Sequence, residues 1–112
     1  MNVDFKGFGE NVATFVADTG LTAPGVAVKV TDDGKVAKCS ANDKFCGICI
    51  AVKDGYATVQ LSGYAEFKAG SKIAPGYQKL AANSNGGVAI NDSAGRELLV
   101  VCSTVSMAGV ML

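Results

Sequence analysis

Residues 23–30 read Ala-Pro-Gly-Val-Ala-Val-Lys-Val, and this stretch decides the fold because it begins an internal repeat. Ala-Pro-Gly returns at residues 74–76 and is again followed by a strand-like run. In each half a turn rich in Asn, Asp and Gly comes next, then a short valine run and a long apolar run. Two copies are too few for a solenoid. They predict a pseudo-symmetric β-barrel or sandwich in which each half closes the open edge of the other.

Alternation with a period of two supports the all-β interpretation. Ala57, Val59 and Leu61 alternate with more polar neighbours, as in a half-buried strand. Directly before them, Asp54-Gly55 has the pattern of a two-residue hairpin loop. No window of the sequence offers an apolar helical stripe with caps. The fold class predicted is therefore all-β.

The repeat divides the chain unequally. Residues 21–112 are predicted to form a single β domain, with halves at about 22–62 and 73–112. Residues 1–20 lie before the repeat and are expected to form an extended N-terminal arm. That arm holds Phe5, Phe8 and Phe15, three of the five phenylalanines in the chain. The arm is expected either to fold back on the barrel or to dock onto another subunit.

Charge and hydropathy exclude several classes of partner. Ten basic and ten acidic residues give a net charge of zero, so the sequence indicates no direct nucleic-acid partner. The first residues lack the apolar stretch of a leader, and no run reaches the ~20 apolar residues of a membrane span. We expect a soluble protein made in a cytoplasm, without a membrane partner, whose cysteines are thiols.

Catalytic chemistry finds little support in the sequence. The absence of histidine removes imidazole bases, Ser-His and Cys-His pairs and every histidine-containing metal site. The acidic residues are scattered over turns and strand ends, where solvation and turn formation account for them. No cofactor-binding motif is present. We expect a protein that is not an enzyme and has no cofactor.

Cys46-Gly47-Ile48-Cys49 is a C-x-x-C motif with three readings: buried structural thiols, a metal site or a redox pair. A zinc site would have to recruit Cys39 and Cys102 as its other ligands. Redox chemistry normally places the motif at a helix N-terminus, which a β-type run does not provide. Cys49 and Cys102 are expected to occupy equivalent core strands of the two halves, which favours structural thiols.

The order of these parts resembles the head decoration, or capsid cement, proteins of tailed phages. The cysteine-rich strand departs from that family's pattern. In the first half the resemblance is carried by residues 24–28, 31–38, 45–51 and 57–67, and in the second half, more loosely, by residues 73–76 and 99–102.

The resemblance implies a barrel or tulip-like domain that binds the outer surface of an assembled head. Its partners would be the major capsid protein and two further copies of itself in a homotrimer. It would be located in the virion after synthesis in the host bacterial cytoplasm. Tyr64 and Tyr77, together with the three phenylalanines of the arm, are the candidate interface residues. Two alternatives stay open: another phage structural or carbohydrate-binding β module, and a cysteine-based metal or redox domain.

Overall fold

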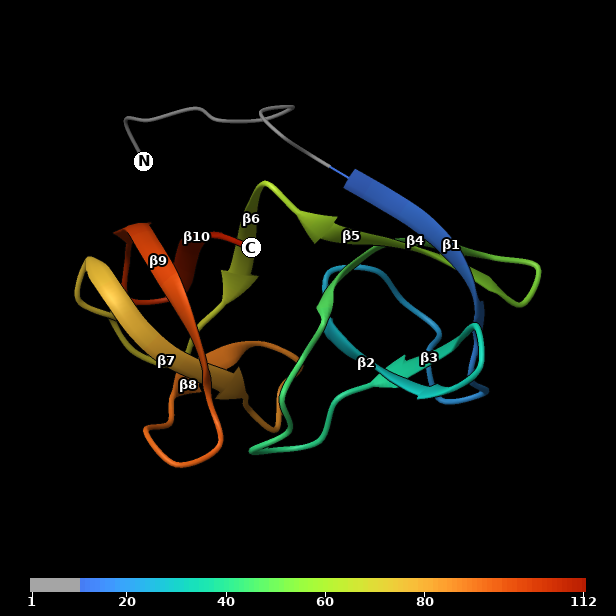
Figure 1. The fold of residues 1–112 in the computed structure, drawn as a ribbon, viewed down its shortest axis with the longest axis horizontal. Helices are drawn as coiled ribbons and strands as arrows, with labels where there is room; N and C mark the ends of the chain where they lie inside the picture. The colour runs from blue at the N-terminus through green and yellow to red at the C-terminus, as the bar shows by residue number, and fades with distance from the viewer. Residues whose placement is uncertain (1–10) are drawn as a thin grey trace.

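A computed structural model describes residues 11–112, and this part of the chain consists of ten strands without a helix (Figure 1). The first half holds β1 (Asn11–Ala17), β2 (Ala27–Asp32), β3 (Lys35–Lys38), β4 (Gly47–Lys53) and β5 (Tyr56–Ser62). The second half holds β6 (Tyr64–Lys68), β7 (Gly76–Ala82), β8 (Val88–Ile90), β9 (Arg96–Ser103) and β10 (Met107–Met111).

The first half is a closed barrel with the strand order β1-β3-β2-β4-β5. The predicted hairpin is confirmed: Asp54 and Gly55 join β4 to β5 with φ of 54° and 80°. Positive φ at both central residues matches the right-handed twist of the strands, and glycine adopts it without strain. β1 closes the barrel by pairing antiparallel with β5 and parallel with β3.

The second half repeats this topology, which confirms the two-half, all-β prediction. It is a five-stranded sheet with the order β6-β10-β9-β7-β8. The same order results when the closed barrel is read in the opposite direction from β1, as β1-β5-β4-β2-β3, and each strand is replaced by the strand five places later. The pairs Phe15↔Ala57 and Phe67↔Ala108 are equivalent in register. The parallel pair Ala17↔Val36 that closes the first barrel returns as one isolated bridge, Ala69↔Val88.

The predicted boundaries of the halves need correction. Residues 11–17 were assigned to the arm, but they form β1 of the first barrel. Residues 63–72, which lie between the two predicted halves, contain β6, the counterpart of β1. Each repeat therefore starts one strand earlier than Ala-Pro-Gly indicates. Residues 1–10 lie outside the described residues.

Cys49 and Cys102 lie on equivalent strands, β4 and β9, as predicted, but they do not occupy equivalent positions on those strands. Cys49 pairs with Val59, whose counterpart Val110 pairs with Val100. A β-bulge in each half sets this register. The structural counterpart of Cys49 is thus Val100, so the two cysteines do not form a matched pair.

The cores of the two halves are shared through Phe45. This residue precedes β4 of the first half, yet it is 1% exposed in the core of the second, together with Ala27, Cys39 and Ile48. Its ring centroid lies 5.0 Å from that of Phe67. A ring of this size buries enough apolar surface to contribute several kcal/mol to folding.

Polar contacts surround this joint between the halves. The guanidinium of Arg96 lies 5.6 Å from the Phe45 ring centroid and donates to the carbonyl oxygens of Phe45 and Cys46 at 3.2 and 3.3 Å. The backbone N–H of Ala82 donates to Asp43 O at 2.9 Å, and that of Ala27 donates to Gly86 O at 2.8 Å. The halves are therefore joined by backbone pairing as well as by a common core.

Truncating Phe45 tests whether the joint stabilises the whole chain. We predict that Phe45→Ala lowers the free energy of unfolding by about 3–5 kcal/mol, because it leaves a cavity in the shared core. Urea denaturation followed by circular dichroism measures the change. Val30→Ala, at an exposed site, is the control and should change stability by less than about 0.5 kcal/mol. A Phe45→Ala effect as small as that of the control would contradict the shared core.

Asp43 gives the joint a pH dependence. Its carboxylate accepts from Lys29 Nζ at 2.6 Å and from the backbone N–H of Ser40 at 2.8 Å, and these bonds lower its pKa below 3.8. A carboxyl whose pKa is lower in the folded state than in the unfolded state stabilises the fold when the pH is above the unfolded-state pKa. This contribution is lost as the pH falls through the folded-state pKa. We therefore predict that Asp43→Asn reduces the decline in melting temperature during acidification. An unchanged decline in the variant would refute this role.

Candidate interaction surface

The four cysteines do not gather into a site. Cys39 is buried in the second core, Cys49 is buried in the first, and Cys46 packs against the first. Among residues 11–112 no three Cys, Asp or Glu side chains are placed to hold a metal ion. The glycine of the motif has a packing role, because a Cβ on Gly47 would lie 2.1 Å from the carbonyl oxygen of Gln60.

Burial favours the neutral form of three thiols, the two of the C-x-x-C motif and Cys39. Burial raises the pKa of Cys39 to about 12, and burial also raises the pKa of Cys46 and of Cys49. Metal binding and disulfide exchange both need the thiolate. The surroundings of these three residues therefore favour structural thiols over the metal and redox readings.

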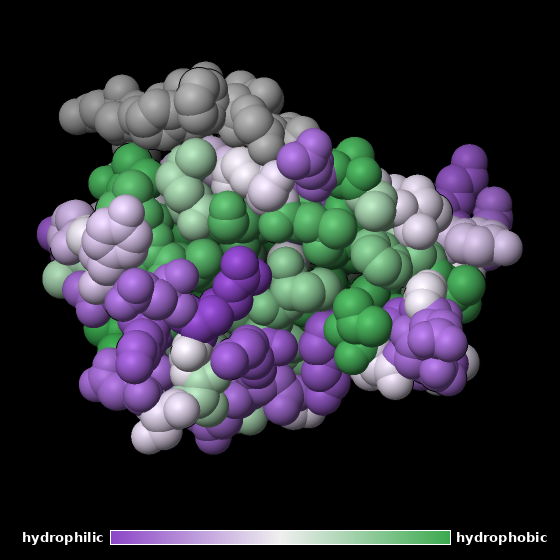
Figure 2. Space-filling view, in the orientation of Figure 1, coloured by the Kyte–Doolittle hydropathy of each residue, from purple (hydrophilic) through white to green (hydrophobic). Residues whose placement is uncertain are grey.

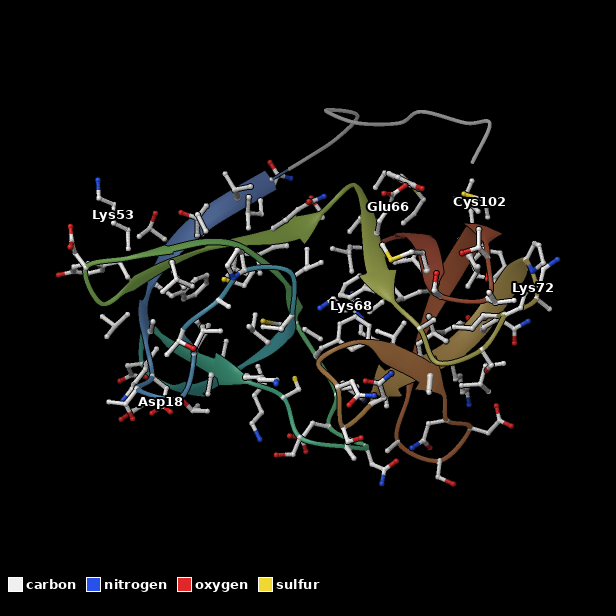
Figure 3. The ribbon with its side chains drawn as sticks, turned by 180° about the vertical axis from the view of Figure 1, so that it is seen from behind. Asp18, Lys53, Glu66, Lys68, Lys72 and Cys102 are labelled. Atoms are coloured by element: carbon white, nitrogen blue, oxygen red, sulfur yellow. The ribbon has the colours of Figure 1, made fainter. Side chains whose placement is uncertain are left out.

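The acidic residues are also dispersed. Figure 3 shows Asp18 at the far end of the first half and Glu66 in the second. Asp18 lies 3.6 Å from Lys35 Nζ, and Glu66 accepts a hydrogen bond from the Tyr64 hydroxyl at 2.9 Å. Two carboxylates that converge on one substrate bond are required for paired acid–base hydrolysis. Asp18 and Glu66 do not provide such a pair.

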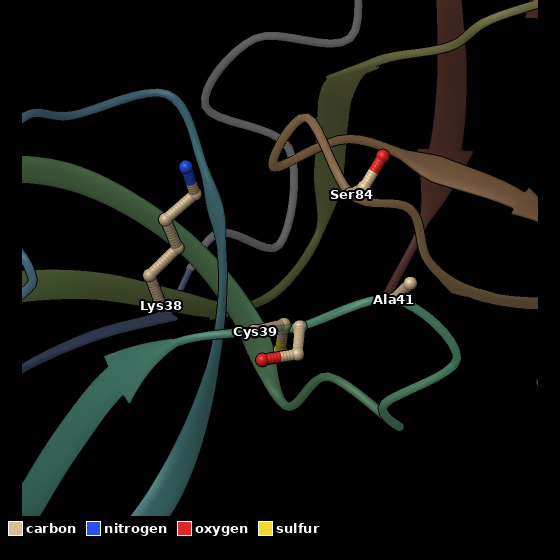
Figure 4. A pocket seen from close by; sticks show the side chains of 5 residues that line it. Lys38, Cys39, Ala41 and Ser84 are labelled. Carbon is tan, nitrogen blue, oxygen red and sulfur yellow. The ribbon is translucent and has the colours of Figure 1, made fainter.

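An open depression of about 390 Å³ lies where the halves meet (Figure 4). Lys38 and Ser84 flank it, one from each half, and Cys39, Ser40 and Ala41 complete the lining. The lining contains neither an imidazole, the commonest general base in enzymes, nor a carboxylate.

The predicted interface residues fall into different environments. Phe5 and Phe8 lie outside the described residues. Phe15 points inward from β1 and packs against the first core, as its counterpart Phe67 does in the second. Tyr64 is only 4% exposed, whereas Tyr77 is 71% exposed. Of the described candidates, Tyr77 is the one that offers a large apolar surface to a partner.

Tyr64 and Tyr77 nevertheless belong to one structural feature, which we call the tyrosine row. Tyr77 on β7 pairs with Leu99 on β9, Leu99 pairs with Met111 on β10, and Met111 pairs with Tyr64 on β6. Directly paired residues share a face of the sheet. The row is therefore an uncharged line across four strands, on which Leu99 and Met111 are half-buried.

The Tyr64 side chain is locked at its end of the row. A Cβ on Gly109 would lie 2.2 Å from the Tyr64 hydroxyl oxygen, so the ring needs a glycine beneath it. The hydroxyl contacts Glu66 Oε2 at 2.9 Å and Cys102 Sγ at 3.4 Å. Burial raises the pKa of Tyr64, and hydrogen bonding to Cys102 and Glu66 adds to the shift. This ring is a fixed wall of the surface.

A second apolar surface lies on the outside of the first barrel, and the sequence analysis missed it. Val12, Thr14 and Val16 of β1 lie beside Tyr56 and Thr58 of β5, and we call this set the β1–β5 face. Val12 and Val16 are 54% and 46% exposed. Outward positions on a solvated sheet are normally polar, and exposed apolar patches often mark binding sites. The sequence does not reveal this face, because β1 has apolar residues at its inward positions and at its outward positions alike, so no alternation marks the outer side.

The fold and its surfaces define a small β domain that combines a closed five-stranded barrel with a second five-stranded sheet and has apolar outer faces. No protein-family model and no curated protein matches the sequence. Among solved structures, the chain is similar to the N base of the head fibre gp8.5 of bacteriophage phi29, with a TM-score of 0.63 and 18% identity. The similarity covers 92% of this chain and 93% of that chain. At this identity the similarity establishes a shared fold.

Residues 11–112 include no helix that could cross a membrane.

The reactivity of Cys39 tests its burial. We predict that iodoacetamide leaves Cys39 unmodified in the folded chain at about pH 8, because a thiol is alkylated as the thiolate. Mass spectrometry after digestion measures the labelling, and urea-unfolded protein, labelled at all four cysteines, is the control. Equally fast labelling of Cys39 in the folded chain would contradict its buried, neutral state.

Proposed function

We propose that this chain is a structural protein of a tailed-phage virion that decorates the outer surface of the assembled head without catalysis. The observation that carries the proposal is the fold, a closed barrel joined to a second five-stranded sheet. Over more than nine-tenths of both chains this fold is similar to the N base of a phage head fibre. The resemblance of residues 24–67 to head decoration proteins points independently to the same location. The major capsid protein is the proposed partner.

The β1–β5 face is the proposed contact with the capsid shell. It is exposed, lies on one side of a closed barrel and contains no charged side chain. An uncharged surface of Val, Thr and Tyr side chains loses little polar solvation when it is covered. Tyr56 is 56% exposed and supplies the large aromatic contact that protein interfaces favour.

Self-association into a homotrimer completes the proposal. The net charge of zero gives little electrostatic repulsion between neighbouring copies. Each copy then needs only a modest contact with the shell, because three linked contacts act together and raise the overall affinity. Sedimentation equilibrium of the free protein should give three times the chain mass, and a monomer would refute the trimer.

Binding to purified heads tests the function. We predict saturable co-sedimentation of the protein with expanded heads and none with unexpanded shells. Val16→Lys should weaken binding to expanded heads by about tenfold or more, because it places a charge in the covered face. Val105→Lys is the matched control, since Val105 is another exposed valine, located in the β9–β10 turn of the second half.

Two results would contradict the proposal in different ways. A lack of binding to any head would refute head decoration. Equal binding by Val16→Lys, Val105→Lys and the unaltered chain would leave decoration in place but exclude the β1–β5 face as the contact.

A further inference from the structure

The depression where the halves meet is a polar surface that the proposed contact with the shell does not use. Its lining includes Lys38 and Ser40 from the first half and Ser84 from the second (Figure 4). In Figure 2, hydrophilic residues gather along the lower edge of the molecule, where the segment between β3 and β4 runs in Figure 1. An ammonium group and two hydroxyls can all donate to a carboxylate. The chemistry of the lining therefore favours an acidic ligand.

The Lys38 side chain is available to such a ligand. It is exposed, and it takes no part in the ion pairs found among residues 11–112, which are Lys29–Asp43 and Lys35–Asp18. A Cβ on Gly86 would lie 3.3 Å from Lys38 Cε, so the aliphatic stem of the lysine runs along this glycine. Asp43, on the same loop as Ser40, is bound by Lys29 and by the Ser40 N–H, so it does not compete for Lys38.

The turn that carries Ser84 is fixed in place. Asn83 Oδ1 accepts hydrogen bonds from the backbone N–H groups of Asn85 and Gly87, both at 2.9 Å. The carbonyl oxygen of Gly86 attaches the turn to β2 of the first half at 2.8 Å. A surface that is ordered before binding loses little conformational entropy when a ligand arrives.

The turn between β2 and β3 is the counterpart of this turn and has the opposite character. It has Asp32 and Asp33 at the positions of Ser84 and Asn85. Both aspartates are exposed, and the Asp32 carboxylate accepts from the Asp33 N–H at 2.8 Å. Asp33 lies at the tip of the hairpin, beside Gly34 with its φ of 67°. The first half thus presents an acidic tip, whereas the second half keeps its turn beside the depression neutral.

The acidic tip and the depression lie at opposite ends of one hairpin. Lys38 pairs with Val28, four residues along β3 from the Asp33-Gly34 tip, a distance of about 13 Å along the strand. The two charges are therefore separated within one chain, and each is free to meet a second copy. A contact between two different surfaces is heterologous, and it repeats head to tail until the ring closes.

We propose that each copy inserts Asp33 into the depression of the next copy, where Lys38, Ser40 and Ser84 bind the carboxylate. Three such contacts close the ring of the homotrimer, so this inference rests on the self-association in the proposed function. One exposed ion pair contributes little to affinity. The contact therefore depends on the two hydroxyl donors and on ring closure, which makes the three contacts act together.

Charge exchange tests the contact in the full-length chain. Lys38→Glu and Asp33→Lys each place like charges together, and each should raise the concentration at which half of the trimer dissociates by about tenfold or more. The double variant restores an opposite pair and should return this concentration to within about threefold of that of the unaltered chain. Sedimentation equilibrium measures the three variants, and added salt should weaken the unaltered trimer.

Two further variants are matched to these. Ser84→Asp introduces the residue that the first half has at the equivalent position, so the turn is retained, and its carboxylate should weaken association as Lys38→Glu does. Lys72→Glu makes the same change of charge at an exposed lysine of the second half, outside the lining, and should leave association unchanged (Figure 3). Circular dichroism verifies that each variant is folded.

The possible failures are distinguishable. A monomeric unaltered chain would refute the homotrimer and this contact together, while the binding of heads is measured separately. A trimer that persists unchanged in Lys38→Glu and Ser84→Asp would overturn this contact alone. So would a double variant as weak as the single ones, or an equal loss in Lys72→Glu, since neither result is compatible with a specific pairing of the two charges.

Discussion

The ring of Phe45 lies in the core of the second half although its chain segment belongs to the first, and the rest of the fold depends on this placement. The second barrel is closed between β6 and β8 by one isolated bridge, so its core needs the side chains that the first half supplies. Arg96 holds the segment that carries Phe45 in place, because its guanidinium donates to the carbonyl oxygens of Phe45 and Cys46. Gln60, buried at the β5–β6 junction, donates to the carbonyl oxygens of Ser62 and Tyr64 at 3.0 and 2.7 Å. The two barrels are thereby joined into one domain.

The duplicated halves have diverged most on their outer faces. At the position of Tyr64 in β6, β1 has Val12, and at the position of Gly109 in β10, β5 has Thr58. In the second half an aromatic ring therefore lies over a glycine and is held by Glu66 and Cys102. The first half has no ring at that place, so β-branched side chains stay exposed. One topology thus presents two surfaces of different chemistry, which suits a protein with two different contacts to make.

The sequence revealed the parts of the fold that depend on local backbone chemistry. Gly25 and Gly76, the glycines of the two Ala-Pro-Gly copies, have φ of 88° and 108°, a conformation that other residues adopt only with strain. β1 and β6 escaped detection although both contain Ala-x-Phe-x-Ala, at residues 13–17 and 65–69, because the strands that they pair with are far away in the chain. The sequence analysis predicted Tyr77 as an interface residue, and in the structure its side chain is exposed. The β1–β5 face was not predicted, because Val12 and Phe15 look alike in a pattern and only tertiary packing decides which of them points inward.

Native-state hydrogen exchange tests most directly whether Phe45 makes the two barrels one unit. The amides of β4 in the first half and β9 in the second should share the same highest free energy of exchange, equal to that of global unfolding, because neither half keeps its core without the other. Denaturant should lower both values with the same slope. Protection of β4 that persists while β9 exchanges through a separate opening of lower free energy would contradict the account, since it would show that the halves unfold independently.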